Sequence, residues 1–81
     1  MWFVYFLQSV NYDFVYVGRS NNVKRRHMEH NEGLSQSTKH YAPFTLAGYV
    51  AVPSEERAIE LERYFKTGSG KAVLKKRILG I

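Results

Sequence analysis

The alternation of apolar and polar positions along the chain predicts the element order β-β-α-β-α-α. Residues 2–7 are apolar at every position, which is typical of a strand covered on both faces and therefore central in its sheet. Residues 14–18 form a second strand-like run, and residues 44–52, between two prolines, form a third. Asn21 or Asn22 can cap a helix that ends near Asn31, and Ser54 can cap another that ends at Gly68–Gly70. A last helix follows from residue 71.

This order predicts an α/β (α+β) fold, in which helices flank a small three-stranded antiparallel sheet. The 81 residues are expected to form a single domain, residues 1–81. Ser35–Tyr41 contains few apolar residues and is expected to be an exposed loop. We expect the first two strands to pair across a two-residue turn at Val10–Asn11, which would place Tyr5 directly opposite Tyr16 on one face.

Composition narrows the range of partners. Twelve Lys and Arg residues against seven Asp and Glu give a net charge of +5, which suggests a polyanionic partner. Because the chain has no cysteine, a metal would be held by carboxylate, imidazole or water, which favours a hard cation. No apolar stretch approaches the roughly 20 residues that span a bilayer. Met1–Leu7 lacks a basic leader and a cleavage site, so we expect a cytoplasmic protein that does not bind a membrane.

Polar side chains on two of the predicted helices point toward the sheet. At about 100° per residue, Arg26 and His30 fall within about 60° of Val23, the inward position of the first helix, whereas Glu29 points away. For each residue alone the ordinary interpretation is structural, with Arg26 extending to solvent and His30 satisfied in the core. On the second helix Glu62 lies about 40° from the apolar stripe. It therefore needs a cation, which is either a salt-bridge partner such as Arg26 or a lysine, or a metal ion.

Two phenols, a guanidinium, an imidazole and one carboxylate facing inward are suited to phosphodiester hydrolysis. They belong to Tyr5, Tyr16, Arg26, His30 and Glu62. A carboxylate can hold a Mg²⁺ ion that keeps most of its waters and coordinates a phosphate oxygen. A guanidinium fits the charge that develops on phosphorus, and a tyrosine or histidine can take a proton from the attacking water.

Several short motifs occur in an order and at a spacing that are specific when taken together. They are Phe3-Val4-Tyr5, Tyr16-Val17-Gly18, Asn22-Val23-Lys24-Arg25-Arg26, Glu29-His30-Asn31, Ser37-Thr38-Lys39-His40, Leu61-Glu62-Arg63-Tyr64-Phe65-Lys66 and Lys66-Thr67-Gly68-Ser69-Gly70-Lys71. With these motifs the chain resembles, over essentially its whole length, the GIY-YIG nuclease superfamily. It is most similar to the small stand-alone excinuclease-like branch, related to the N-terminal nuclease domain of the bacterial excinuclease of nucleotide-excision repair. Phe3 replaces the glycine of the first motif, and Arg19 stands where some relatives have a lysine. Arginine stays protonated and cannot act as a base.

The resemblance implies an endonuclease dependent on Mg²⁺ or Mn²⁺ that leaves a 5′ phosphate and a 3′ hydroxyl, in a role like DNA repair or recombination. Its catalytic residues would be Tyr5, Tyr16, Arg26, His30 and Glu62, with Glu62 as the metal ligand and one of the two tyrosines assisting deprotonation of the water. The substrate would be nucleic acid, with DNA preferred over RNA. Expected contacts to it come from Arg19, Lys39, His40, Lys66 and Lys71.

The alternative is a non-catalytic, basic nucleic-acid-binding module on the same scaffold. It would contact backbone phosphates through Arg26, Lys39, Lys71, Lys75, Lys76 and Arg77. Such a module gains nothing from an inward acid, so Glu62 favours the nuclease. A protein-interaction domain explains the positive charge least well. Because no residues remain for a DNA-recognition domain, we expect selection of substrate shape or recruitment by a protein partner.

Overall fold

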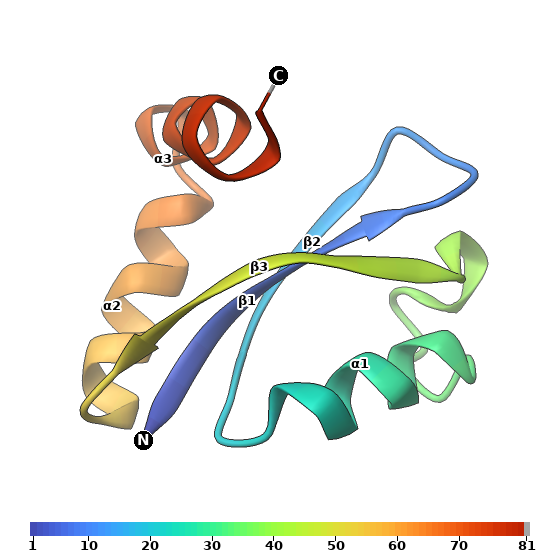
Figure 1. The fold of residues 1–81 in the computed structure, drawn as a ribbon, viewed down its shortest axis with the longest axis horizontal. Coiled ribbons are helices and arrows are strands. Elements are labelled where there is room, and N and C mark those ends of the chain that lie inside the picture. Colours follow the sequence, from blue (N-terminus) through green and yellow to red (C-terminus); the bar gives the residue numbers. More distant parts are fainter. Residues whose placement is uncertain (81) are drawn as a thin grey trace.

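The structure is a computed structural model that describes residues 1–80, and it confirms the predicted fold class. Within this range β1 (Trp2–Ser9), β2 (Val15–Ser20) and β3 (Phe44–Val52) form one antiparallel sheet in the order β2-β1-β3. The helices are α1 (Val23–Asn31), α2 (Glu55–Phe65) and α3 (Gly68–Val73), and α3 continues into a π-helical segment, Leu74–Leu79. A 3₁₀ turn, Lys39–Tyr41, precedes β3 (Figure 1).

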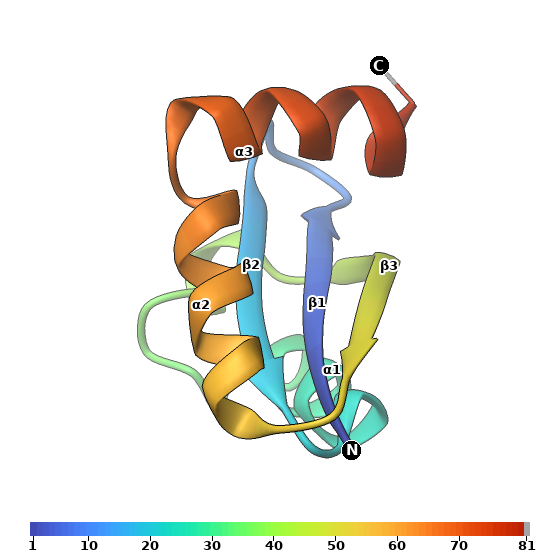
Figure 2. The same ribbon diagram turned by 90° about the vertical axis from the view of Figure 1, so that its left-hand side faces the viewer.

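Helix α1 lies on one face of the sheet, and α2 with the C-terminal helical segments covers the other face (Figure 2). Alternate side chains of β1 point to the two faces, so each face has its own core. Val4 and Phe6 pack with residues of α2 and the C-terminal helical segments, namely Ala58, Phe65 and Leu74. Tyr5 and Leu7 pack on the other face with Phe44 and with residues around α1 and the 3₁₀ turn. All four β1 side chains are at most 1% exposed, which confirms that this strand is central and covered on both sides.

The predicted N-caps begin α1 and α2. Asn22 Oδ1 accepts a hydrogen bond from the backbone N–H of Arg25, and Ser54 Oγ accepts one from Arg57. Each such cap stabilises its helix by about 1 kcal/mol. The predicted end of the second helix at Gly68–Gly70 is wrong, because α2 ends at Phe65 and these glycines lie inside α3.

A close approach of two helices explains why glycine stands at position 70. A Cβ atom there would lie 1.8 Å from the carbonyl oxygen of Tyr64 in the last turn of α2. Thr67 connects the two helices, since its Oγ1 donates to the same carbonyl and accepts a hydrogen bond from the Gly70 N–H. The sharp corner between α2 and α3 therefore requires Gly70.

The predicted two-residue turn at Val10–Asn11 is wrong. The backbone N–H of Ser9 donates to the carbonyl of Phe14 at 2.9 Å, so the turn comprises residues 10–13. Ser9 Oγ holds this longer turn, because it accepts a hydrogen bond from the N–H of Tyr12 and donates to the carbonyl of Tyr41. A buried serine with these two contacts gives the turn a tertiary anchor that local turn chemistry does not reveal.

The longer turn shifts the register, so Tyr5 lies opposite Gly18 and not opposite Tyr16. The shift involves an even number of residues, which leaves every side chain on its original face. Tyr5 and Tyr16 are therefore still neighbours, with ring centroids 6.1 Å apart, but they meet diagonally across the strand pair.

The sequence predicted that Ser35–Tyr41 would be an exposed loop. This is wrong for Thr38, which is only 1% exposed. Thr38 directly precedes the 3₁₀ turn, and its hydroxyl is hydrogen-bonded to His30 of α1. Among residues 1–80, no helix combines the length and the apolar character needed to cross a membrane.

Candidate active site

Four of the predicted catalytic side chains meet on the α1 face of the sheet. Tyr5 comes from β1, Tyr16 from β2, and Arg26 and His30 from α1. The His30 ring lies 4.7 Å from the ring of Tyr16 and 6.2 Å from that of Tyr5. The inward orientation of Arg26 and His30, predicted from the helical period, agrees with this arrangement.

Gly18 makes room for the two tyrosine rings. A Cβ atom at this position would lie 2.6 Å from the Tyr5 hydroxyl oxygen and 2.7 Å from Cε2 of Tyr16. Real Cβ atoms do not approach other atoms so closely, so the phenols can lie over the β2 backbone only because residue 18 has no side chain. The glycine of the second motif therefore has a packing role at the site.

His30 is completely buried and bonded at both ring nitrogens. Its Nε2 lies 3.2 Å from the Tyr5 hydroxyl and its Nδ1 lies 2.7 Å from Oγ1 of Thr38. Burial and the positive charge of Arg26 lower its pKa below the ordinary value of 6.5. The imidazole is therefore neutral at physiological pH, with one nitrogen donating and the other accepting a hydrogen bond. The structural interpretation of His30 as a satisfied core histidine holds, and it also fixes the Tyr5 hydroxyl in place.

The two phenols have different environments. Tyr5 is 1% exposed, and burial raises its pKa above 10.0, although a hydrogen bond with Arg26 opposes the rise. Negative charge at Glu62 and ionisation of Tyr16 would raise the pKa further. Tyr16 is only half buried, at the surface of the strand edge. Only Tyr5 is thus coupled to a second proton carrier, whereas Tyr16 is open to solvent.

Arg26 is held by its helix neighbour Glu29, a contact that agrees with the expectation that Glu29 points away from the sheet, because residues three apart lie side by side on a helix. Nη1 of Arg26 donates to Oε1 of Glu29, three residues later on α1. The pair is about one-third exposed at the mouth of the site. An arginine held in this way keeps further N–H donors for an anion, since its guanidinium has five.

Glu62 does not share the tyrosines' face, and this corrects the expectation that the five side chains point at one face of the sheet. It comes from α2 on the opposite face, where Arg19 of β2 also points. Arg19 Nη1 donates to Oε1 of Glu62 at 2.7 Å, and Lys66 Nζ donates to Oε2 at 2.8 Å. The carboxylate side chain is 12% exposed. Its partners are Arg19 and a lysine, whereas the salt bridge expected with Arg26 does not form.

These ion pairs set the charge of the carboxylate. Burial disfavours ionisation of Glu62, but the hydrogen bonds from Lys66 and Arg19 outweigh it and hold the pKa below 4.5. Arg19 likewise has a raised pKa because it donates to this carboxylate. Glu62 is therefore an anion at neutral pH, and the adjacent cations offset its desolvation.

One cleft of about 460 Å³ joins the two faces across the free edge of β2. Tyr5, Tyr16 and Arg26 line it from one face, and Arg19 and Glu62 line it from the other. This is possible because β2 is the edge strand, so side chains on both of its faces border the same opening. The polar side chains of the candidate site therefore lie on both sides of the free edge of β2.

A divalent cation fits this cleft through a single protein carboxylate. Within residues 1–80, no group of three or more His, Cys, Asp or Glu side chains could together hold a metal ion. Mg²⁺ is commonly bound through one or two carboxylates, substrate phosphates and its own waters, so it does not need such a group. Each oxygen of Glu62 has one hydrogen-bond donor, and a carboxylate offers about four lone-pair positions. The donor set therefore fits a hard cation that also binds a phosphate oxygen.

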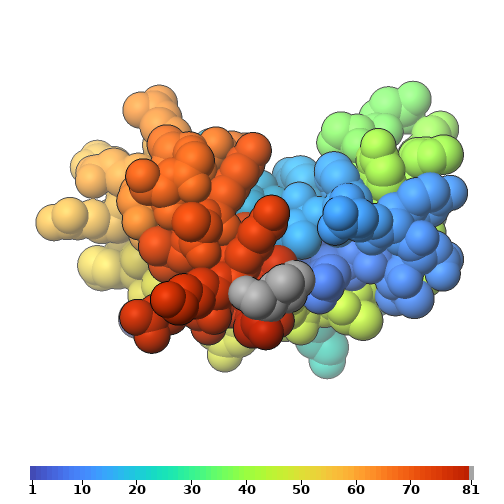
Figure 3. Space-filling view, turned by 90° about the horizontal axis from the view of Figure 1, so that it is seen from above, coloured from blue at the N-terminus to red at the C-terminus, as the bar shows by residue number. Residues whose placement is uncertain are grey.

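The residues expected to contact nucleic acid divide into two separate groups. Arg19 lines the cleft with Glu62, and Lys66 and Lys71 lie beside it around the start of α3. Lys39 and His40 belong to the 3₁₀ turn, and the green segment that contains them stands at the opposite end of the molecule from α2 (Figures 1 and 3). His40 packs its ring against Tyr12 and Tyr41 instead, and neither Lys39 nor His40 lines the cleft.

Residues with supporting roles were not assigned from the sequence. Thr38 binds His30, Glu29 holds Arg26, and Gly18 admits the tyrosines. The sequence carried a signal for all three, because Gly18, Glu29 and Thr38 lie within short motifs at fixed spacing from the candidate residues. Their contacts, however, connect segments far apart in the chain, which residue types alone do not reveal.

Comparison with known proteins identifies a family but no individual relative. A sequence model described as the GIY-YIG catalytic domain matches residues 1–77. No curated protein and no solved structure gave a significant match.

Proposed function

This chain belongs to the GIY-YIG catalytic-domain family and is therefore a nuclease-type domain that acts on nucleic acid, and we propose that it is a metal-dependent DNA endonuclease with its active site at the β2 edge. GIY-YIG nucleases generally depend on a divalent metal. The observation that carries the proposal is the single cleft lined by Tyr5, Tyr16, Arg26 and Glu62, because it unites all the groups that phosphodiester hydrolysis needs.

Arg26 is proposed to bind the scissile phosphate. It lines the cleft, and its contact with Glu29 fixes the side chain while leaving further N–H donors free. A guanidinium pairs with two phosphate oxygens in a planar, bidentate geometry and stabilises the charge that develops as water attacks phosphorus. Arg19, which forms an ion pair with Glu62, is proposed to contact a neighbouring phosphate.

Tyr5 and Tyr16 are proposed to take part in proton transfer from the attacking water. Tyr5 is hydrogen-bonded to His30 Nε2, so a proton that reaches this phenol can pass to the imidazole. Tyr16 is half buried at the cleft, so the proposed route for a proton from this phenol leads to solvent and not to His30. The variants Tyr5→Phe and Tyr16→Phe separate these routes. If a tyrosine accepts the proton, removing its hydroxyl should remove one ionisation from the pH–rate profile.

Glu62 is proposed to hold Mg²⁺ or Mn²⁺. When bound, the ion supplies Lewis-acid stabilisation of a phosphate oxygen and favours deprotonation of water. The chain's own contribution is a carboxylate that is already ionised at neutral pH and a cationic rim that attracts the phosphate. The pairing of Glu62 with two cations balances its charge before any metal binds.

Cleavage of labelled oligonucleotides tests the proposal. The protein should cut branched, nicked or single-stranded DNA with Mg²⁺ or Mn²⁺, and EDTA should stop the reaction. Glu62→Gln should lower the rate by at least about a hundredfold, as expected when a group that stabilises the reaction's charge is lost. The matched control is Glu60→Gln, which removes an exposed carboxylate from the same helix and should cut normally.

Two results would overturn this function. One is the absence of cutting on every substrate by folded protein, and the other is cutting by Glu62→Gln at the rate of Glu60→Gln. Circular dichroism of each variant establishes that it is folded, so a lost activity cannot be ascribed to lost structure.

A non-catalytic binding module is the second candidate function, and one observation favours it. Arg19 and Lys66 satisfy Glu62 without any metal, so the acid also has a structural role. This candidate predicts binding to DNA in EDTA that weakens with salt and survives Glu62→Ala. Metal-dependent cutting would exclude it.

A further inference from the structure

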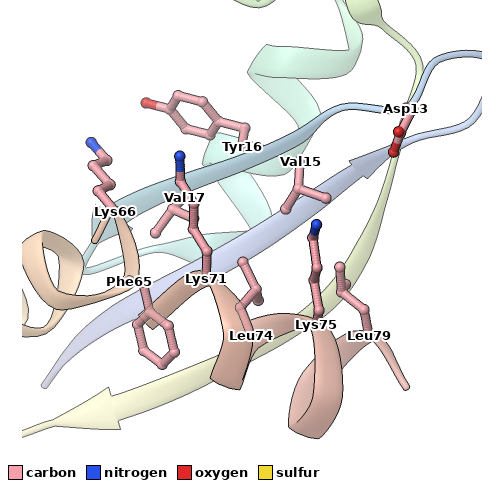
Figure 4. A pocket seen from close by; sticks show the side chains of 10 residues that line it. All are labelled: Asp13, Val15, Tyr16, Val17, Phe65, Lys66, Lys71, Leu74, Lys75 and Leu79. Carbon is pink, nitrogen blue, oxygen red and sulfur yellow. The ribbon is translucent and has the colours of Figure 1, made fainter. Parts of the chain in front are cut away.

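A second groove adjoins the candidate active site, between the edge strand β2 and the C-terminal helical segments (Figure 4). It has a volume of about 630 Å³ and an apolar floor. The floor is formed by Val15, Val17, Phe65, Leu74 and Leu79. Figure 4 shows the valines of β2 pointing toward the leucines of the helical segments, so the floor connects two parts of the chain.

The rim of this groove is positively charged. Lys66, Lys71 and Lys75 line it, and their side chains are exposed. Asp13, in the hairpin turn, is the acid among the lining residues and lies at the far end (Figure 4). Within residues 1–80, neither Lys71 nor Lys75 forms an ion pair. An apolar floor with unpaired cations along one rim matches a ligand that has a flat apolar part and an anionic part.

The groove lies next to the candidate catalytic cleft and shares a lining residue with it. Tyr16 lines both, and Lys66 on the groove's rim donates to Oε2 of Glu62. A strand whose scissile phosphate lies at Arg26 and Glu62 would therefore bring its neighbouring nucleotide to the groove.

We propose that this groove binds the base and phosphate of an unpaired nucleotide adjacent to the scissile phosphate. The apolar floor takes the face of the base, and Lys71 and Lys75 take its phosphate. A base inside a duplex is stacked between its neighbours and paired with the opposite strand, so it cannot enter such a groove without leaving the helix. The inference rests on the proposed nuclease function and deepens it, because it assigns the substrate class as nucleic acid with a single-stranded nucleotide at the cut site.

Binding to a fluorescent oligonucleotide in EDTA tests this without requiring cleavage. Single-stranded DNA containing 2-aminopurine and the same strand in a duplex are titrated with the full chain. Burial of one base face against the apolar floor is expected to strengthen binding on the order of tenfold, so the single strand should bind about tenfold more tightly than the duplex. The 2-aminopurine fluorescence should change as binding saturates.

Two double variants with the same charge change provide the comparison. Lys71→Glu with Lys75→Glu reverses the charge of the groove's rim, whereas Arg57→Glu with Arg63→Glu makes the same charge change at exposed residues of α2 that do not line the groove. The rim variant should lose at least about tenfold in single-strand affinity together with the fluorescence change, as charge reversal at phosphate contacts requires. The control variant should keep the fluorescence change at saturation.

Several outcomes would overturn the inference. Equal binding of single strand and duplex would do so, as would equal losses in the two double variants. Sedimentation of the free protein as a dimer that the rim variant dissociates would assign the groove to a second copy of the chain. A groove-dependent fluorescence change without cleavage under Mg²⁺ or Mn²⁺ would instead reject the nuclease function and leave nucleotide binding in place. Cleavage without any preference for unpaired nucleotides would reject only the groove's role.

Discussion

Replacing Gly18 by alanine tests whether the missing side chain at this position is what lets the two phenols form the site. The added Cβ atom would lie 2.6 Å from the Tyr5 hydroxyl oxygen, 2.7 Å from Cζ of Tyr5 and 2.7 Å from Cε2 of Tyr16. At least one ring must move. Because the Tyr5 hydroxyl is hydrogen-bonded to His30 at 3.2 Å, a shift of this ring breaks a buried contact.

The expected loss of stability follows from three contributions. Overpacking by one methyl group costs about 1–3 kcal/mol. Loss of the Tyr5–His30 hydrogen bond adds about 1 kcal/mol. Alanine restricts the unfolded chain more than glycine does, which returns about 0.4–1 kcal/mol. Gly18→Ala should therefore lower the free energy of unfolding by roughly 2 kcal/mol, well within the ~4–12 kcal/mol expected for a domain of this length.

Urea unfolding followed by circular dichroism measures this change. Gly68→Ala is the matched control, since a Cβ atom there would meet no other atom within 4 Å. Tyr5→Phe removes the hydroxyl that lies closest to the new methyl group. Gly18→Ala should therefore cost at least about 0.5 kcal/mol less in the Tyr5→Phe background than in the wild type. If Gly18→Ala is as stable as Gly68→Ala, or if the two substitutions at positions 5 and 18 are additive, then the packing argument is wrong.

The remaining predictions concern pH and the corner between α2 and α3. Because the folded protein holds His30 below its ordinary pKa of 6.5, the unfolded chain binds the extra proton first, and stability should fall as the pH drops below about 6.5. His30→Asn should remove this dependence, whereas His40→Asn, at an exposed position, should keep it. The lowered pKa of Glu62 contributes stability above about pH 4.5 that is lost as the pH falls through the folded value. Glu62→Gln should therefore cost on the order of 1 kcal/mol at pH 7 and nothing near pH 2, and equal costs at both pH values would contradict this account. Gly70→Ala should destabilise by at least about 3 kcal/mol in urea unfolding, because its Cβ would lie 1.8 Å from the Tyr64 carbonyl, and a small effect would show that the corner can open.

Local patterns predicted the elements and the inward side chains because those features depend on near neighbours in the chain. The apolar run of β1 and the caps at Asn22 and Ser54 need no knowledge of the rest of the fold. The helical period likewise placed His30 toward the sheet, since it depends only on spacing within α1.

The hairpin register could not be predicted in the same way. Ser9 holds the longer turn through a contact with Tyr41, which lies 32 residues away in the sequence. The partners of Glu62 on α2 were similarly hidden, because Arg19 reaches it from β2, 43 residues away in the sequence. In each case a contact distant in sequence decided between conformations that local residue preferences leave nearly equal.

The sequence by itself determined which side chains are available and toward which side of its own element each one points. Residue type and the periods of strand and helix fix both properties, and together with the motif spacing they indicated a nuclease-type domain. Only the tertiary structure decided that α1 and α2 lie on opposite faces of the sheet, so that Glu62 meets Tyr5 and Tyr16 around the edge of β2. The physical reason is that sheet order and helix placement depend on how two separate cores bury their apolar surface, and that burial is a property of the whole chain.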